Sequence, residues 1–342
     1  MLIRTLDYAS RFRCLAGACP HTCCADWEVV IDEDTARRYQ TLSGPLGEKL
    51  RKNLRRDEDG DFCFSLDGGR CPFLDGENLC EIHRALGEDA TSVTCREHPR
   101  FTEDYGPFRE ITLSASCPEA NALLLGDPAP LAVLETERPE EPEDEGDEWL
   151  EDLLCLRGRL LMLLEDRTRP VRRRLADFLA LAGTAQQALD DDRPEALPEL
   201  AETWTAPENR PVSDGPGVFP AALEFLGTLE ALDPDWRELL AAAETVPAAV
   251  QPEALLERIG VYFAFRYLLT AVNDGDLLGR AQLCVLAVLT AERLAAVCGL
   301  PEALRRFSRE IEHDEEHLAL LTEAFRQLEA LSPAAFFRTL DS

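Results

Sequence analysis

Apolar and polar residues follow two different periods along this chain. In the first third, short runs show the two-residue alternation, or the β-branched and aromatic enrichment, of strands. These runs are residues 27–32, 61–66 and 108–114. Residues 34–54 have a helical pattern that breaks near Gly44 and Pro45. We therefore expect a small α+β region with many loops in this part of the chain.

From residue 149 onward, leucine, phenylalanine and alanine recur at intervals of three and four, which predicts helices. Residues 149–166 show this spacing clearly, and Pro170 opens another helix at a position that favours proline. Further helices are expected at residues 219–232, 235–244, 252–272, 277–298, 301–312 and 314–331. Such stripes are typical of core packing, so this region is predicted to be an all-α domain.

An acidic stretch separates the two regions. Residues 135–148 read ETERPEEPEDEGDE, which is typical of a solvated linker or an extended loop. We therefore predict a cysteine-rich, metal-binding domain at residues 1–130, an acidic linker at 131–148 and a helical domain at 149–342. The expected fold class is α+β, mainly α.

Net charge and composition limit the binding partners and the cellular location that we expect for this protein. The 342 residues include 65 acidic and 35 basic side chains, which gives a net charge of −30. Such a surface repels nucleic-acid phosphates and attracts cations, including lysine-rich protein segments, although acidic surfaces most often serve solubility. The N-terminus lacks the apolar core of a signal peptide, and no apolar run reaches the roughly 18 residues of a membrane span. We expect a cytoplasmic protein whose thiols stay reduced.

Twelve cysteines in a reducing compartment indicate a metal rather than disulfides. Nine of them precede residue 118. Eight of these nine are the predicted metal ligands: Cys14, Cys19, Cys23, Cys24, Cys71, Cys80, Cys95 and Cys117. Cys63 lies in a strand-like run and is expected in the core. Cys155, Cys284 and Cys298 lie in apolar helical patterns and are expected to be small core residues.

The spacing of the thiols favours an iron–sulfur cluster, with a structural zinc as the alternative. Thiolates select zinc, iron–sulfur clusters or copper(I). Only Cys19 and Cys23 have the tight spacing of a zinc pair, whereas a cluster accepts thiolates from distant loops. The adjacent Cys23 and Cys24 are expected to point in different directions. The Cys-x3-Cys-x2-Cys triplet of radical S-adenosylmethionine enzymes is absent, because residue 26 is Asp26.

These cysteine motifs resemble those of the bacterial flagellin lysine-N-methylase family. The similar segments in the first third are Phe12-Arg13-Cys14 with Cys19, then residues 23–27 (CCADW), 71–74 (CPFL), 79–83 (LCEIH), 94–100 (TCREHPR) and 116–119 (SCPE). In the helical region they are residues 265–269 (FRYLL), 274–277 (DGDL) and 308–313 (SREIEH). The cysteine-rich part is also similar to a wider family of zinc- or iron-chelating domains.

The resemblance implies a methyltransferase that uses S-adenosylmethionine to methylate lysines of flagellin in the cytoplasm, before export. It further implies a [4Fe–4S] cluster linked to the cysteine motif, and peripheral membrane association of some members. The alternative is a non-catalytic zinc- or iron-binding module whose helices bind a partner protein.

Lysine methylation needs a neutral amine, so a base must remove the proton of the ammonium. On motif grounds, the candidate catalytic residues are His98, Glu312 and His313. Asp274 and Asp276, in a turn between two apolar helices, are candidates for binding the substrate ammonium; helix capping is the alternative.

Three residues are candidates for binding the cofactor. Arg96 and Arg100 could pair with the carboxylate of S-adenosylmethionine, or they could neutralise an anionic thiolate cluster. Trp27 could stack on the adenine.

Overall fold

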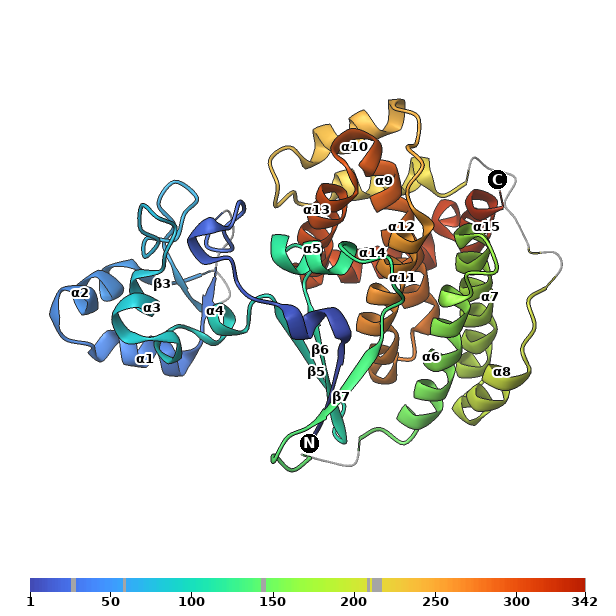
Figure 1. The fold of residues 1–342 in the computed structure, drawn as a ribbon, viewed down its shortest axis with the longest axis horizontal. Coiled ribbons are helices and arrows are strands. Elements are labelled where there is room, and N and C mark those ends of the chain that lie inside the picture. The colour runs from blue at the N-terminus through green and yellow to red at the C-terminus, as the bar shows by residue number, and fades with distance from the viewer. Residues whose placement is uncertain (26–28, 58–59, 143–145, 208–209, 211–216, 342) are drawn as a thin grey trace.

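The computed structural model describes residues 1–25, 29–57, 60–142, 146–207, 210 and 217–341. A small N-terminal lobe stands apart from a larger body that is mostly helical (Figure 1). The fold is α+β and mainly α, which confirms the expected fold class.

The small lobe consists of the described residues between 13 and 97. Its elements are β2 (Val30–Ile31), α1 (Glu33–Thr41), α2 (Gly44–Asn53), β3 (Leu54–Arg56), β4 (Phe62–Phe64), α3 (Glu81–Leu86) and α4 (Val93–Glu97). The three strands form a sheet in the order β2-β4-β3. Asp32 begins α1 because its side chain accepts a hydrogen bond from the Thr35 N–H at 2.9 Å. The predicted helical break near Gly44 is confirmed, since Gly44 has a positive φ of 83° and separates α1 from α2.

The lobe has a hydrophobic core of its own. Its buried members are Ile31, Ala36, Tyr39, Leu50, Phe64, Phe73, Ile82 and Ala90. Two of the predicted metal ligands, Cys71 and Cys80, pack against the edge of this core. A core of this size provides little stability by itself, so the lobe is a structure that a bound metal would stabilise considerably.

The segments just before and just after the small lobe in the sequence belong to the body. There, β1 (Leu2–Leu6), β5 (Arg100–Asp104), β6 (Phe108–Leu113) and β7 (Val133–Glu137) form a sheet in the order β5-β6-β1-β7. The first strand pairs in parallel with β6 and antiparallel with β7. A strand therefore occupies part of the expected acidic linker. The domain boundaries at residues 130 and 148 stay predictions.

Helices make up the rest of the body. They are α5 (Pro118–Leu125), α6 (Leu150–Glu165), α7 (Val171–Asp190), α8 (Leu197–Thr203), α9 (Phe219–Thr228), α10 (Trp236–Thr245), α11 (Glu253–Tyr267), α12 (Leu277–Cys298), α13 (Leu300–Glu312), α14 (Glu315–Gln327) and α15 (Pro333–Leu340). The central helix α12 packs against α7, α11 and α13. Within the described part of the chain, α12 is the one helix long and apolar enough to span a membrane, and 72% of its apolar window is buried inside the protein.

A buried ion pair fastens the sheet to the helices. Both Nη atoms of Arg157 on α6 lie 2.6 Å from the two carboxylate oxygens of Glu110 on β6. The same guanidinium also donates to the Phe265 carbonyl on α11 at 3.3 Å. Three elements that are distant in the sequence therefore meet at one side chain.

We expect Arg157→Ala to destabilise the protein by about 3–5 kcal/mol, because Glu110 would remain buried without its partner. Urea denaturation followed by circular dichroism measures this loss. The matched control is Arg37→Ala, which breaks an exposed pair with Asp34 and should cost less than about 1 kcal/mol. Equal losses in the two variants would contradict the role of the buried pair.

Candidate functional site

A cavity of about 590 Å³ is lined by residues of both the small lobe and the body. Its wall includes seven of the eight predicted metal ligands: Cys14, Cys19, Cys23, Cys24, Cys80, Cys95 and Cys117. The eighth, Cys71, is not on the wall, but its backbone N–H donates to the Cys24 carbonyl at 2.8 Å. Segments up to a hundred residues apart in the sequence thus contribute thiols to one place.

Backbone contacts join the segments of Cys24, Cys71 and Cys80 in the small lobe. The hydrogen bond between Cys71 and Cys24 links two loops, and an antiparallel bridge between Leu74 and Cys80 adds a third segment. Cys95 lies in the first turn of α4, where its N–H donates to the Ser92 hydroxyl at 3.2 Å. Burial, and then the charge of neighbouring thiolates, raise the pKa of Cys71 to about 12. Burial also raises the pKa of Cys80 and Cys95, so Cys71, Cys80 and Cys95 are protonated thiols at neutral pH.

The remaining thiols extend this group toward the body. Cys117 precedes α5, and burial raises the pKa of its thiol, to which Cys19 and Cys14 also contribute. The loop of Cys14 and Cys19 lies close against the 75–79 loop, because a Cβ at Gly17 would come within 2.5 Å of the Glu77 carbonyl oxygen. The thiol of Cys19 donates to the His21 carbonyl at 3.1 Å.

The adjacent Cys23 and Cys24 do not point in different directions as expected. Both line the cavity, and their side chains form a hydrogen bond with each other. This bond lowers the pKa of Cys24 to about 7. The Cys24 N–H donates to the Thr22 hydroxyl at 3.2 Å, so the backbone turns tightly just before the pair.

The thiols around the cavity are suitable ligands for a thiophilic metal, but they are too far apart in this structure to coordinate one. No disulfide joins the described cysteines. Among the described residues, no group of three or more Cys, His, Asp or Glu side chains is close enough to hold a metal. A metal replaces the thiol protons and offsets the mutual repulsion of the thiolates, which are soft ligands for iron or zinc. Binding would require the loops to bring the thiols closer together.

The four cysteines that were expected in the core differ in their burial. Cys63 and Cys284 are buried, as predicted, and Cys298 is half-buried. Cys155 is exposed, so its assignment to the core is wrong. It lies on the solvent side of α6, whose buried face carries leucines at other positions.

The three candidate catalytic residues lie near one another beside the cavity. His98 lines the cavity, and the centroid of its ring is 6.0 Å from that of His313. The Nε2 atom of His313 lies 2.8 Å from both the Ser114 and the Ser116 hydroxyl oxygens. Burial lowers the pKa of His98 to about 4 and that of His313 to about 3, so both rings are neutral at pH 7.

The third candidate, Glu312, is buried at the end of α13. The hydroxyls of Tyr262 and Tyr267 donate to its carboxylate at 3.0 Å and 3.2 Å, and Arg266 Nε lies 2.9 Å from Oε1. The Ser308 hydroxyl donates to the other oxygen, Oε2. Burial raises the pKa of Glu312. Two of the motifs in the helical region, residues 265–269 and 308–313, therefore meet in this network.

Two candidate cofactor residues lie on the cavity wall. Arg96 donates to the Thr91 carbonyl, and the guanidinium carbon of Arg100 lies 5.6 Å from the centroid of the Phe12 ring. Trp27 lies outside the described residues.

Sequence reasoning missed further residues at the site. Arg305 and Arg309 of α13 also line the cavity, and Arg266 holds Glu312. The available signal was helical spacing, because Ser308 and Glu312 are four residues apart and so share one face of α13.

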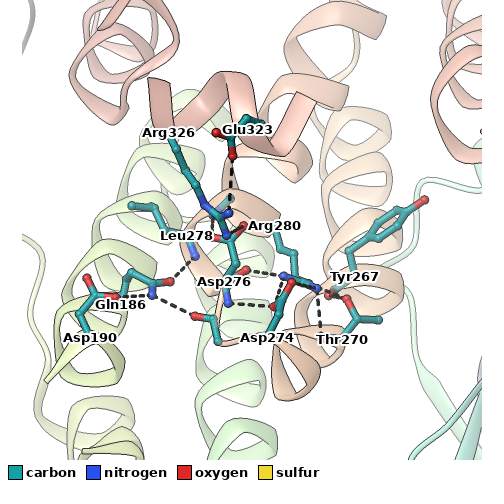
Figure 2. A network of polar contacts seen from close by, with 12 residues as sticks. Gln186, Asp190, Tyr267, Thr270, Asp274, Asp276, Leu278, Arg280, Glu323 and Arg326 are labelled. Carbon is teal, nitrogen blue, oxygen red and sulfur yellow. Dashed lines mark hydrogen bonds and ion pairs between the residues drawn. The ribbon is translucent and has the colours of Figure 1, made fainter. Parts of the chain in front are cut away.

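Asp274 and Asp276 are not among the residues that line the cavity. Figure 2 shows them in a polar network with Arg280 and Arg326. Asp276 accepts from the Gly279 N–H at 3.0 Å, which caps α12, and lies 3.0 Å from Arg326. Asp274 is paired with Arg280 at 2.8 Å. Both carboxylates thus fix the turn before α12, and their role in substrate binding stays a prediction.

Comparisons with known proteins agree with the position of the cavity in the first third of the chain. Residues 13–117 match a family described as a putative zinc- or iron-chelating domain. The lysine-N-methylases of Salmonella typhimurium and Salmonella choleraesuis are 31% and 30% identical over 136 residues, or 37% of this chain and 33% of each relative. The flagellar biosynthetic protein FliU of Salmonella muenchen is 30% identical over 134 residues, or 37% of this chain and 78% of that protein. The alignment thus spans about a third of the two methylases, and no solved structure matches the chain.

We expect Cys80→Ser to lose bound metal and to destabilise the small lobe, and Cys71→Ser to do the same. Metal content per chain and the midpoint of thermal unfolding measure the two effects. Cys155→Ser is the matched control and should keep both values, while Cys284→Ser should keep the metal. Equal metal loss in both sets of variants would mean that the cysteines are divided wrongly.

The buried His313 should make stability depend on pH. Its folded pKa of about 3 lies below the ordinary value of 6.5, so the unfolded chain binds the proton more tightly. This contribution is complete above pH 6.5 and is lost as the pH falls toward 3, by up to about 1 kcal/mol per pH unit. The free energy of unfolding of His313→Asn should therefore decline less steeply between pH 6.5 and 4.5 than that of the unaltered protein. Parallel curves would contradict this.

Proposed function

Because the chain belongs to the family of the lysine-N-methylases and FliU, as its cysteine motifs predicted, we propose that it methylates lysine side chains of flagellin. The methyl donor would be S-adenosylmethionine, and the reaction would take place in the cytoplasm before export. The net charge of −30 favours the approach of lysine-bearing segments.

The observation that carries this proposal is that thiols able to bind a metal and a histidine able to act as a base lie around one cavity. Seven of the eight predicted thiol ligands lie on its wall, and His98 lies on the same wall. Behind the wall are His313 and Glu312, which belong to a different part of the sequence. A site that combines a metal with a base suits group transfer better than metal storage.

We propose that the eight cysteines hold a [4Fe–4S] cluster, with zinc as the alternative. A cluster would supply electron-transfer chemistry, and zinc would supply Lewis acidity. Widely spaced loops supply these thiols, which suits a cluster better than a tetrahedral zinc site. The matched family description, zinc- or iron-chelating, agrees with either metal.

Arginines on the cavity wall support the binding of the cofactor carboxylate. Arg96 and Arg100 come from the lobe and the adjoining strand, while Arg305 and Arg309 come from α13. Arg305 is already paired with Glu302 through two contacts of 2.8 Å, so Arg96 and Arg100 are the cations proposed for the anionic group. Trp27 is the residue proposed to stack on the adenine of the cofactor.

A lysine that enters the cavity must lose a proton before it can accept a methyl group. His98 can receive that amine directly, since it lines the cavity, and its neutral ring can accept a hydrogen bond from the ammonium.

A second candidate function is a non-catalytic metal module that binds a partner protein. One observation favours it: the family match covers only the cysteine-rich residues 13–117. The name of the FliU relative also states a role in flagellar biosynthesis and no reaction.

Label transfer separates the two functions. Protein purified without oxygen, with its metal content measured, is incubated with methyl-labelled S-adenosylmethionine and flagellin. We expect label on flagellin lysines, and its loss in Cys80→Ser together with the metal, whereas Cys155→Ser should stay active. Protein with intact metal that transfers no label would favour the metal module.

A further inference from the structure

A continuous row of hydroxyl groups leads from the cavity to the buried Glu312. Ser116 lines the cavity, and its Oγ lies 2.8 Å from Ser114 Oγ. Ser114 Oγ lies 3.4 Å from Ser308 Oγ, which in turn donates to Glu312 Oε2. The row crosses from the segment after β6 to α13, so it exists only because these two parts of the body are packed together.

We propose that this row, the hydroxyl relay, carries the proton of the substrate ammonium to Glu312. The inference rests on the proposed function and specifies where the proton of the lysine goes. The ammonium gives one proton to Ser116, each hydroxyl passes its own proton onward, and Ser308 delivers one to the Glu312 carboxylate. The products are a neutral lysine amine, three unchanged hydroxyls and the carboxylic acid of Glu312.

Glu312 is better suited to keep this proton than either histidine. Burial lowers the pKa of both His98 and His313, which makes them weak bases. Burial raises the pKa of Glu312 instead, which makes its carboxylate a stronger base than an ordinary glutamate. His313 contributes differently: its Nε2 lies within hydrogen-bond distance of both Ser114 and Ser116, which positions their hydroxyls in the row.

The groups that contact Glu312 favour its ionised form, which can accept a proton, whereas its burial favours the protonated form. Arg266 on α11 supports the ionised form, while the hydroxyls of Tyr262 and Tyr267 donate to it from the same helix. Tyr8, in the turn after β1, is buried near enough that Glu312 contributes to the rise of its pKa. Arg266 also lies over the Phe101 ring, with its guanidinium carbon 3.3 Å from the centroid, so its charge is fixed in place.

The first test compares Ser308→Ala with the unaltered, metal-loaded protein in steady-state methyl transfer to flagellin. We expect kcat to fall by about 100-fold at pH 7 with KM unchanged, at the lower end of the range of general acid–base effects. The deficit should shrink toward pH 10, because more of the lysine is then neutral without the relay. Ser308→Thr keeps a hydroxyl and should restore the rate. The control is Thr290→Val, which removes a buried hydroxyl on α12, and it should keep the normal pH profile.

The second test is independent of turnover. Infrared difference spectra are recorded when a lysine-containing flagellin peptide is added to the protein, with a norleucine peptide as the control. The lysine peptide should produce a carboxylic-acid band that is absent in Glu312→Gln and weak in Ser308→Ala.

The outcomes separate the relay from the proposed function. If the unaltered protein transfers label but Ser308→Ala matches it at every pH and gives the same band, the relay is wrong and the methylase stands. If no label is transferred but the band forms, the methylase fails and the relay stands. A band that persists in Glu312→Gln would place the proton elsewhere and overturn the relay.

Discussion

The proposed chemistry depends on thiols from the small lobe and from the body being gathered around one cavity. Isolated from a metal, such thiols keep their protons, because burial and mutual repulsion raise the pKa of Cys71 and Cys95 to about 12 and 11. A bound soft cation favours the deprotonated form of these thiols. Each thiolate then forms a bond to the metal, and the positive charge offsets the repulsion between the thiolates. The small lobe has only a modest core, so this exchange contributes directly to its folding. Cys117 adds a thiol from the body, and the same centre would then also hold the lobe against the helices.

The second constraint is a buried carboxylate. Removing Glu312 from water is costly unless its charge is paired and hydrogen-bonded, and Arg266, Tyr262 and Tyr267 meet that requirement. The same contacts bring α11 against α13 and place His313 beside the sheet. A network of this kind is consistent with packing alone, but its connection through serines to a cavity with thiols gives it a chemical use. The buried carboxylate thus connects through Ser308, Ser114 and Ser116 to the cavity whose wall carries the thiols.

Much of the architecture could be predicted from the sequence, because helices and short strands leave periodic patterns. The break at Gly44 and the long helix over residues 277–298 were visible in this way. The strand β7 was missed because its five residues are exposed and its surroundings are acidic, so no buried face marks it. The strand β1 was missed too, since its parallel partner β6 is about a hundred residues away and only the folded chain brings them together.

The residues of the candidate site were also predictable only in part. Thiol spacing identified the cysteines that line the cavity, since soft ligands are rare and conspicuous. Ser116 and Arg309 were noted only as parts of family-like motifs, and Ser114 was not noted at all. Serine and arginine occur throughout the chain, so their place at the site is visible only in the folded structure. The direction of Cys23 and Cys24 was predicted wrongly because the tight turn at Thr22 cannot be read from adjacency alone.

The central claim is that thiols from the lobe and from the body meet around one inorganic centre. X-ray absorption at the edge of the bound metal, on protein purified without oxygen, counts the sulfur atoms bound to it. The account predicts a shell dominated by sulfur that loses sulfur neighbours in Cys80→Ser and again in Cys117→Ser. A shell of nitrogen and oxygen, or one unchanged by both substitutions, would contradict it.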